Sequence, residues 1–366
     1  MKSRTLGTGS LIAGAVILLI GMVLQFAVIP AQAQFPDDVE RTRVYEGELS
    51  VMLNADALAT GDLANVFLRD VPITVDRQVE TLEVDGSSAL VSDVSVLNGP
   101  AGPIQASEDI YTIDRKTMEH IDNFTEDDRV IEREGLVVGF PIGTEQQDYL
   151  GFNGDTLETN TLTYVGTSEV NGLATYEFAA ASGPDVITDP VLLGSFPAAL
   201  PQALIQGLLP TLGLPEAAVA QFAQLLPTLP DPIPLTYTYT YDTSYQVEPD
   251  SGMLVDYTKV ESRVAGVTVG DQFIPVTEVM NLGYELSDAS IADAVSEAED
   301  AQSLLFWVGK VLPYSTLAIG AVLLLFGLLM MALGPKGPAS PANSKGIDLT
   351  DEKAEGVAQP PAELVT

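Results

Sequence analysis

Leu11–Ile29 reads LIAGAVILLIGMVLQFAVI, and this apolar stretch decides how the rest of the chain must be organised. No charged residue occurs between Arg4 and Asp37. About 20 consecutive apolar residues cross the hydrocarbon core of a bilayer, and backbone amides in lipid must be bonded within the segment itself. The sequence therefore predicts a transmembrane helix over residues 11–31, preceded by a short N-terminal segment over residues 1–10.

A second apolar stretch lies near the other end of the chain. Residues 311–333 also carry no charge, and Trp307, Lys310 and Tyr314 mark their start with side chains typical of the membrane–water interface. We expect a second transmembrane helix over residues 311–333, followed by a disordered tail over residues 335–366. An acidic helix with a capping box at Ser290 and Asp293 should precede it, with an interruption near Pro313.

Charges beside the two apolar stretches predict their orientation. Lys2 and Arg4 precede the first stretch and three lysines follow the second, whereas acidic residues occupy the other two boundaries. The positive-inside rule then predicts a two-pass plasma-membrane protein with both termini cytoplasmic and residues 37–305 extracytoplasmic. In an alternative interpretation, the Ala31-Gln32-Ala33 pattern marks cleavage of a secretory signal after Ala33, although the apolar run is longer than a usual signal core.

Glycines recur every seven residues in both apolar stretches. Because seven residues make about two helical turns, each series lines one face of its helix. Small residues on such a face let two backbones approach closely in lipid. We predict an antiparallel helix–helix seam along these glycines, against the alternative that glycine is simply frequent in membrane helices. The seam residues are Gly7, Gly14, Gly21, Gly320, Gly327 and Gly334.

The segment between the apolar stretches is strongly acidic. It carries 46 Asp and Glu against ten Lys and Arg, the latter all between Arg41 and Arg263. Such a surface repels phosphate backbones, so we exclude nucleic acid as a partner. The chain has no cysteine, which excludes disulfides, thiolate metal sites and cysteine nucleophiles.

Catalytic and metal-binding patterns are scarce in this sequence. The single histidine, His120, excludes a histidine-rich zinc site and is expected at the surface, and no nucleophile elbow, Walker loop or dinucleotide fingerprint occurs. Acidic residues between Asp122 and Asp128 could hold a hard cation such as calcium, but their spacing does not match an EF-hand and favours a solvated loop. The sequence predicts a protein that is not an enzyme, with no catalytic residue, cofactor or metal, and leaves calcium binding by the acidic surface open.

From Val44 to Leu286, short β-branched and aromatic runs alternate with glycine, proline and Asx turns, which predicts antiparallel strands. Tyr237, Tyr239 and Tyr241 alternate with threonine, as a half-buried sheet requires. Two hairpins with Asx-Gly turns, one at Asp85-Gly86 and one at Asn171-Gly172, each precede a further strand. We predict a mainly β extracytoplasmic domain built either as two similar subdomains or as one continuous curved sheet.

Residues 195–230 form an apolar insertion in this β segment. We expect two short helices, Ala198–Leu209 and Pro215–Leu226, each with one apolar stripe. These stripes are either buried against the sheet or exposed as an apolar contact surface for lipid or a partner protein. The stripe residues are Leu204, Leu208, Leu209, Val219, Phe222, Leu225 and Leu226.

The order of several stretches resembles a known family. An N-terminal apolar segment precedes Ile113–Thr117, then Gly139–Thr144, Tyr164–Gly166 with Val170–Phe178, a Pro-Asp-Ser-Gly turn at Pro249–Gly252, and a final apolar segment. This order is similar to that of the actinobacterial PorA-like family, double-anchored envelope proteins largely without assigned function, over about residues 6–333. The resemblance implies no catalytic or binding residues. The family label suggests a porin, yet a transmembrane barrel has alternating strands and no long apolar helices.

Two functions remain at this level. The first is a non-enzymatic envelope module that binds or transfers a hydrophobic ligand, and its partners would be membrane lipid, an envelope lipid or another envelope protein. The layout of this module is also similar to that of class B scavenger receptors, which are tethered at both termini and handle lipid. The alternative is a pore-forming permeability protein.

Overall fold

The structure is a computed structural model, and it describes residues 2–122, 130, 133–212, 215–270 and 272–333. Contacts divide the chain into two compact units, residues 1–18 with 319–366, and residues 19–318. The predicted tail over 335–366, Gly334 and the acidic cluster beyond Asp122 lie outside the described residues.

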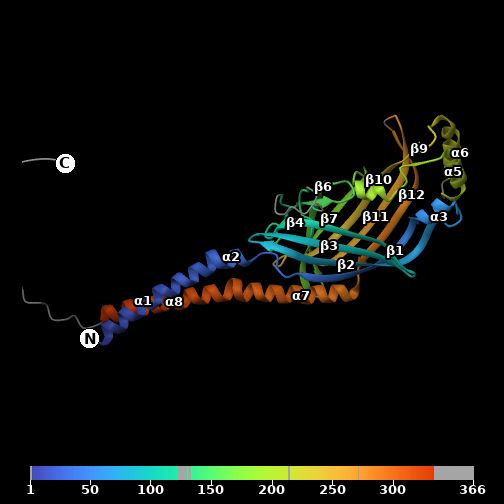
Figure 1. The fold of residues 1–366 in the computed structure, drawn as a ribbon. Coiled ribbons are helices and arrows are strands. Elements are labelled where there is room, and N and C mark those ends of the chain that lie inside the picture. The colour runs from blue at the N-terminus through green and yellow to red at the C-terminus, as the bar shows by residue number, and fades with distance from the viewer. Residues whose placement is uncertain (1, 123–129, 131–132, 213–214, 271, 334–366) are drawn as a thin grey trace, which may run out of the picture. The chain divides into compact units, whose positions relative to one another are not determined.

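Most of helix α1 (Lys2–Val23) and most of helix α8 (Leu312–Leu333) belong to the first unit, where they lie side by side (Figure 1). A Cβ atom added at Gly14 would lie 2.7 Å from the Leu324 nitrogen and 2.9 Å from the Gly320 oxygen. One added at Gly327 would lie 2.8 Å from the Gly7 oxygen. The helices are therefore antiparallel and meet at their glycines, because any side chain there would occupy the neighbouring backbone.

Each apolar helix contains a short π-helical segment beside a proline. Segment η1 (Leu24–Val28) joins α1 to α2 (Ile29–Gln32), which contains Pro30. Segment η4 (Trp307–Val311) joins helix α7 (Asp288–Phe306) to α8, whose second residue is Pro313. Proline lacks an N–H group, and a wider local turn accommodates this loss without breaking the helix. The interruption expected near Pro313 is thus a π-helical segment, and Thr5–Gln32 and Asp288–Leu333 remain two helices long and apolar enough to cross a membrane.

The second unit contains one ten-stranded antiparallel sheet, which confirms the mainly β fold class with flanking apolar helices. Its strand order is β4-β3-β2-β1-β12-β11-β10-β7-β6-β5. The strands are β1 (Glu40–Leu53), β2 (Phe67–Asp85), β3 (Ser88–Gly99), β4 (Gly102–Asp114), β5 (Tyr149–Asn153), β6 (Glu158–Val170), β7 (Leu173–Val186), β10 (Thr236–Glu248), β11 (Met253–Val269) and β12 (Gln272–Leu286).

Both predicted hairpins are present in this sheet. Strands β2 and β3 pair across the Asp85-Gly86 turn, and β6 and β7 pair across Asn171-Gly172. Asn171 and Gly172 both have positive φ, 49° and 91°, as the tight hairpin turn favoured by Asn-Gly requires. Each hairpin then pairs with a third strand, β4 or β10. The two three-stranded groups belong to one continuous curved sheet, the second of the two expected arrangements (Figure 1).

The two edges of the sheet are joined by short bridging segments. Ile113 at the end of β4 pairs with His120, Glu119 pairs with Leu136, and Leu136 pairs with Gly151 on β5. The Leu136 N–H donates to the Leu150 carbonyl and the Phe152 N–H donates to the Leu136 carbonyl, at 2.7 and 2.9 Å. Backbone pairing therefore runs from β4 to β5 at this level, so that the sheet curls around an enclosed interior and its edges are covered.

Helix α7 follows β12 in the sequence and packs against β1 and β11. On the β1 side, the Val44 N–H donates to Ser290 Oγ at 2.9 Å, and on the β11 side Val295 packs with Val255. The helix begins one turn earlier than expected, because Ser287, and not Ser290, is the N-cap residue and accepts from the Ser290 N–H. The Ser290 hydroxyl instead accepts the hydrogen bond from the Val44 N–H of β1.

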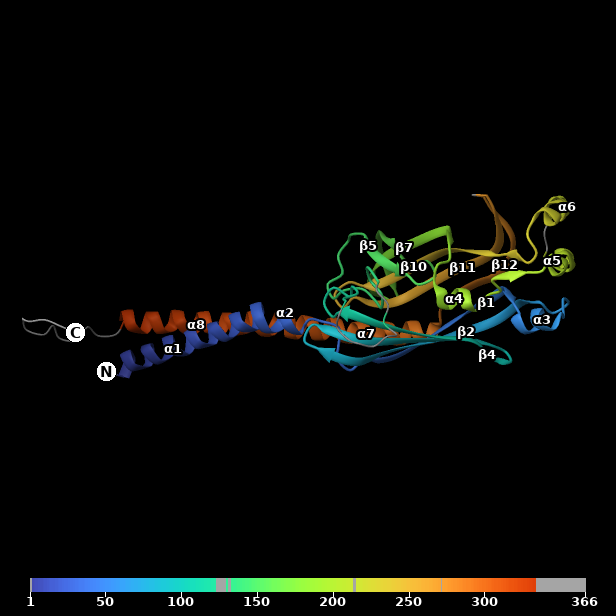
Figure 2. The same cartoon turned by 45° about the horizontal axis from the view of Figure 1, so that its top comes forward.

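The apolar insertion covers one end of the sheet together with helix α3 (Ala55–Thr60), as Figures 1 and 2 show. Helix α4 (Pro190–Gly194) precedes it, and the predicted helices are α5 (Gln202–Leu208) and α6 (Glu216–Leu225), each ending in a 3₁₀ turn, η2 (Leu209–Thr211) and η3 (Leu226–Thr228). Our expectation that the first helix begins at Ala198 is wrong. Strand β8 (Ala199–Leu200) pairs with β9 (Ile233–Pro234), which holds these residues extended and delays the helix until after Pro201.

The seam predicts a specific cross-link. A Cβ atom at Gly7 would lie 3.1 Å from Met331 Cγ, the position that a cysteine sulfur at 331 would occupy. Disulfides form between Cβ atoms about 3.5–4.5 Å apart, which this contact allows. We expect the double variant Gly7→Cys/Met331→Cys to form an intramolecular disulfide on mild oxidation, measured by mass spectrometry of the digested protein.

Adding Gly14→Leu to this pair should reduce the cross-link strongly, because overpacking a close contact typically costs about 1–3 kcal/mol. Gly9→Leu is the matched control, because a Cβ atom at Gly9 meets nothing within 4 Å. Equal cross-linking with Gly14→Leu and Gly9→Leu would rule out the seam.

Candidate functional site

Tyrosines line a central cavity inside the curled sheet. Strand alternation turns Tyr237, Tyr239 and Tyr241 inward, and their exposed fractions are 3%, 2% and 9%. The central cavity has a volume of about 280 Å³. Its tyrosines are Tyr45, Tyr111, Tyr239, Tyr241, Tyr245, Tyr257 and Tyr284. Seven phenol rings from five strands make this interior amphipathic, because each ring is apolar and each hydroxyl can hydrogen-bond.

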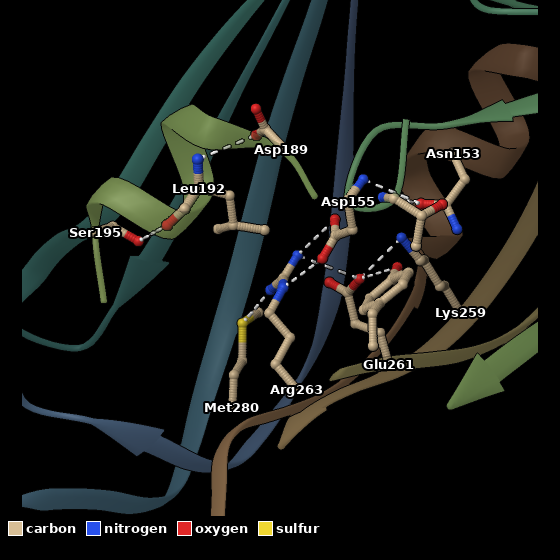
Figure 3. Close-up of polar contacts among 11 residues, drawn as sticks. Asn153, Asp155, Asp189, Leu192, Ser195, Lys259, Glu261, Arg263 and Met280 are labelled. Atoms are coloured by element: carbon tan, nitrogen blue, oxygen red, sulfur yellow. Dashed lines mark hydrogen bonds and ion pairs between the residues drawn. The ribbon is translucent and has the colours of Figure 1, made fainter. Parts of the chain in front are cut away.

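A row of charged side chains on β11 faces the same interior (Figure 3). Lys259 Nζ lies 2.9 Å from Glu261 Oε2, and the Tyr239 hydroxyl donates to that same oxygen at 2.6 Å. The next inward residue, Arg263, donates from Nε to Asp155 Oδ2 at 2.6 Å. Each buried charge in this row therefore has an opposite charge beside it, which is the condition for keeping charges inside a protein.

Ion pairing fixes the protonation states of this row. Burial alone would raise the pKa of Glu261, but Lys259, Arg263 and the Tyr239 hydroxyl lower the pKa of its carboxyl to about 2. Burial would lower the pKa of Lys259, yet the Glu261 carboxylate holds it well above its usual value. Burial also raises the pKa of Tyr257 far above the usual value for a phenol. These groups keep their charge states across neutral pH, unlike a general acid or base, whose pKa lies near the working pH.

A larger cavity, which we call the mouth cavity, adjoins the central one. Its volume is about 670 Å³, and it shares Tyr45, Arg77, Val138, Gly139 and Phe140 with the central cavity. Residues 32–37, which run from the last residue of the first apolar helix, form part of its wall. Ala301, Leu304 and Leu305 near the end of α7 form another part. The mouth cavity therefore lies where the chain enters and leaves its apolar segments.

The wall between the two cavities is formed by residues around Phe140. The Phe140 ring packs on Phe178 with a centroid distance of 4.7 Å. Gly252 lies against this segment with φ of +73°, and an added Cβ atom would lie 2.4 Å from the Pro141 oxygen. The fully buried Glu248 accepts from the Ser251 N–H at 2.8 Å and so holds the turn that contains Gly252. Only glycine fits there, since both the conformation and the space exclude a side chain.

Three of the stretches that carry the family resemblance meet at the mouth cavity. Residues 113–117 contribute Arg115, residues 139–144 contribute Phe140 with two neighbours, and residues 249–252 contribute Ser251 and Gly252. These stretches are far apart in the sequence, and the fold brings them together. The first lies at the end of β4, the second follows the bridging residue Leu136, and the third is the turn between β10 and β11. The mouth cavity is thus the candidate functional site.

Four arginines line the mouth cavity. Arg41 Nε and Arg43 Nη2 lie 2.9 and 2.8 Å from the same Glu297 Oε2. Arg77 Nη2 lies 2.6 Å from Asp93 Oδ2. Arg115 donates from Nε to the Phe35 carbonyl at 2.7 Å and from Nη1 to the Gly86 carbonyl at 3.1 Å. Sequence reasoning missed this group, because its members come from two strands and a turn and have no characteristic spacing. The one signal was the scarcity of cations in the acidic segment.

The predicted apolar contact residues lie inside the second unit. Leu208, Leu209, Phe222 and Leu226 are buried, and Leu204, Val219 and Leu225 are partly buried in the same cluster. This corresponds to the packed alternative for the insertion. A contact surface made from these side chains would require the helices to turn outward. Their role in binding lipid or a partner protein therefore stays a prediction.

Five of the six predicted seam glycines, and the single histidine, lie within the described residues. Gly7, Gly14, Gly320 and Gly327 meet in the first unit, and a Cβ atom at Gly21 would lie 2.9 Å from Leu317 Cδ2 in the second. His120 is not at the surface as expected, because its side chain is 3% exposed. Its backbone joins the sheet edges, and its ring nitrogens contact Thr112 Oγ1 at 3.3 Å and Asp122 Oδ1 at 3.2 Å.

The sequence pattern of the family described as Porin PorA matches residues 6–329. The chain belongs to the porin PorA family. With its two helices long and apolar enough to span a bilayer, this PorA-family chain is a membrane protein. Family membership supports an envelope protein, of which a pore-former is one kind.

Other comparisons add little to the PorA assignment. No curated protein matches the chain. Among solved structures, a conserved hypothetical protein of Mycobacterium tuberculosis with a double hotdog fold, essential for bacterial survival during infection, aligns with 75% of this chain and 80% of its own. The identity is 10% and the TM-score is 0.13, a similarity too low to support any argument about fold or function.

The buried ion pairs predict how stability depends on pH. Because the native pKa of Glu261, about 2, lies below the ordinary value of 4.5, its ionised form stabilises the native state above pH 4.5. That contribution, about 3 kcal/mol, is lost as the pH falls from 4.5 towards 2. We expect Glu261→Gln to lower the free energy of unfolding more at pH 7 than at pH 3, measured by urea unfolding of the full chain.

Glu285→Gln, at an exposed position on β12, is the control and should change stability little at either pH. A pH-independent cost of Glu261→Gln would contradict the assignment of a depressed carboxyl pKa.

Proposed function

We propose that this PorA-family protein is a non-enzymatic envelope module that binds or transfers a hydrophobic ligand through the mouth cavity. The observation that carries the proposal is the cavity itself, about 670 Å³ in volume and lined by apolar side chains together with a few charged ones. Sites for small molecules commonly measure about 300–1,000 Å³ and combine apolar walls with a few polar groups.

The position of the mouth cavity along the chain supports a membrane lipid or envelope lipid as the ligand. Gln32 ends the first apolar helix and also lines the cavity, and Leu304 and Leu305 line it just before the second apolar segment. A ligand could therefore pass between bilayer and cavity with little of its apolar surface exposed to water. This route avoids the free-energy cost of hydrating an acyl chain, about 0.8 kcal/mol per methylene group.

We further propose that the protein is a two-pass plasma-membrane protein whose termini are cytoplasmic and whose β domain is extracytoplasmic. Lys2 and Arg4 on one side, and the lysines after the second apolar segment, support this orientation. Protease added to intact cells should then cut between residues 40 and 290 and spare the tail, and the reverse pattern would contradict the orientation.

The partners that fit this role are membrane lipid and an envelope lipid or protein. Nucleic acid does not fit, given 46 acidic residues against ten basic ones in the outer segment.

A substitution at Gly139 tests the cavity directly. Gly139 lines both cavities, has no positive φ, and a Cβ atom there would meet only Met118 Cε at 3.8 Å. Gly139→Leu should therefore fill the junction of the two cavities without disturbing the backbone. We expect the full-length variant to carry less co-purified lipid than the wild type, measured by mass spectrometry of organic extracts.

Gly166→Leu adds the same volume at a strand position where a Cβ atom meets nothing within 4 Å. Because both variants keep the membrane helices, lipid bound around those helices should be equal in the two samples. If Gly139→Leu and Gly166→Leu retain the same lipids in the same amounts as the wild type, the mouth cavity is not a lipid site.

Pore formation is the second candidate, and the family's description as a porin favours it. Exposed residues on the outer face of the sheet include Glu46, Glu48, Asp76, Glu80 and Asp242, which is unlike the apolar outer band of a membrane barrel. A pore would instead need the apolar helices of several copies. Stepwise conductance of the purified full-length protein in planar bilayers, unchanged by Gly139→Leu, would favour this alternative over ligand binding.

A further inference from the structure

We propose that the mouth cavity takes a single-chain amphiphile with an anionic head group, such as a long-chain fatty acid, and that Arg115 binds the head group. This inference rests on the proposed function and names its ligand class. Four of the ten Lys and Arg in the outer segment line this one cavity, although that segment carries 46 acidic residues. The few cations of this acidic segment are therefore concentrated at the mouth cavity.

Arg115 is a buried cation without an acidic partner among the described residues. Its exposed fraction is 7%, and its two hydrogen bonds go to backbone carbonyls, those of Phe35 and Gly86. Within the part of the chain that the structure describes, no carboxylate lies at ion-pair distance from it. A guanidinium has five N–H donors, so two bonds leave three of them available. A buried charge without a counter-charge is unfavourable, and an anionic head group in the cavity would supply that counter-charge.

Arg41 and Arg43 increase the positive potential of the same cavity. The two guanidiniums share a single carboxylate, Glu297, and Asp37 also lines the cavity. Together with Arg115, these described residues leave one positive charge in excess. Arg77, by contrast, is matched by Asp93. Guanidinium groups bind carboxylate and phosphate oxygens through paired N–H donors, so this excess favours an anionic head group over a neutral one.

The rest of the lining fits an acyl chain. Apolar side chains from the sheet, the bridging segments and α7 surround the arginines, among them Val79, Val84, Met118, Leu254, Leu304 and Leu305. Phe140 and Gly139 then lead towards the tyrosine-lined central cavity. A ligand with one anionic end and one apolar chain matches both parts of the lining, whereas a free anion would leave the apolar walls unused.

The test uses the full-length protein in native membranes with two matched photoactivatable probes, a diazirine palmitate and the corresponding diazirine alcohol. After illumination, mass spectrometry of the digested protein measures labelling of peptides that line the mouth cavity. Labelling of peptides from the two apolar helices reports probe dissolved in the bilayer and serves as the internal standard. We expect the palmitate to label the cavity peptides about tenfold more than the alcohol, relative to this standard, as for one hydrogen bond to a charged group.

Two variants locate the head group. Arg115→Gln should reduce palmitate labelling of the cavity about tenfold and leave labelling by the alcohol unchanged. The double variant Arg41→Gln/Arg43→Gln, which leaves the bonds from Arg115 to Phe35 and Gly86 intact, should reduce palmitate labelling to a smaller extent. Arg69→Gln removes one positive charge from an exposed position outside the cavity and is the control that should have no effect.

The outcomes separate this inference from the function on which it rests. Equal labelling by palmitate and alcohol would overturn the anionic head group and leave hydrophobic-ligand binding intact. Labelling of the apolar helices alone, by both probes, would overturn both proposals. Should Arg115→Gln fail to fold, the double arginine variant still decides, because undiminished palmitate labelling in it would contradict a positively charged head-group site.

Discussion

The structure depends first on the constraint that a backbone in lipid must satisfy its own hydrogen bonds. Two segments of this chain meet that condition as helices, and both tolerate a proline through a π-helical segment that keeps the helix continuous. Because lipid offers no hydrophobic drive for helix association, contact between the two helices falls to residues without side chains. A Cβ atom added at Gly14 would lie 2.7 Å from the Leu324 nitrogen, and one added at Gly320 would lie 2.8 Å from the Leu18 nitrogen, so these positions have no room for a side chain.

In the β domain, a different constraint operates, which is the cost of burying charge. Lys259, Glu261 and Arg263 point into the curled sheet because strand alternation places them there, and each is balanced by a neighbour. Arg77 and Asp93 follow the same rule. Against this background of matched pairs, Arg115 is a buried cation whose bonds within the described residues go to the Phe35 and Gly86 carbonyls. The same β domain thus contains buried charges that are paired and one that is bonded to carbonyls, and this contrast marks Arg115 as a site for an anionic ligand.

The mouth cavity is lined both by residues at the ends of the apolar segments and by residues of the sheet. Its walls come from the ends of both apolar segments, from the turn held by Glu248, and from Val138, Gly139 and Phe140, which follow the bridging residue Leu136. Closing the edges protects them from pairing with other chains and also creates the enclosed volume. A porin in the barrel sense would place apolar residues outside the sheet and water inside, whereas this sheet has acidic residues outside and phenol rings inside.

The sequence by itself determined the elements whose signal is local. Uninterrupted apolar runs predicted both membrane helices, Asn171-Gly172 predicted its hairpin, alternation predicted the inward face of Tyr237, Tyr239 and Tyr241, and heptad spacing placed the glycines on one face. Local signals also misled: Ser290 resembled a cap but bonds β1, Ala199 and Leu200 joined a strand instead of a helix, and the His120 side chain is buried. In each case a long-range partner decided the conformation.

Only the tertiary structure decided the closure of the sheet and the candidate site. His120, Leu136 and Gly151 meet through backbone bonds, which leave no pattern in side-chain order. Arg41, Arg77 and Arg115 are separated by dozens of residues, so neither spacing nor composition could show that they line one cavity. Local sequence fixes periodicity and turns because these depend on neighbouring residues, whereas a binding site depends on which strand ends meet in space.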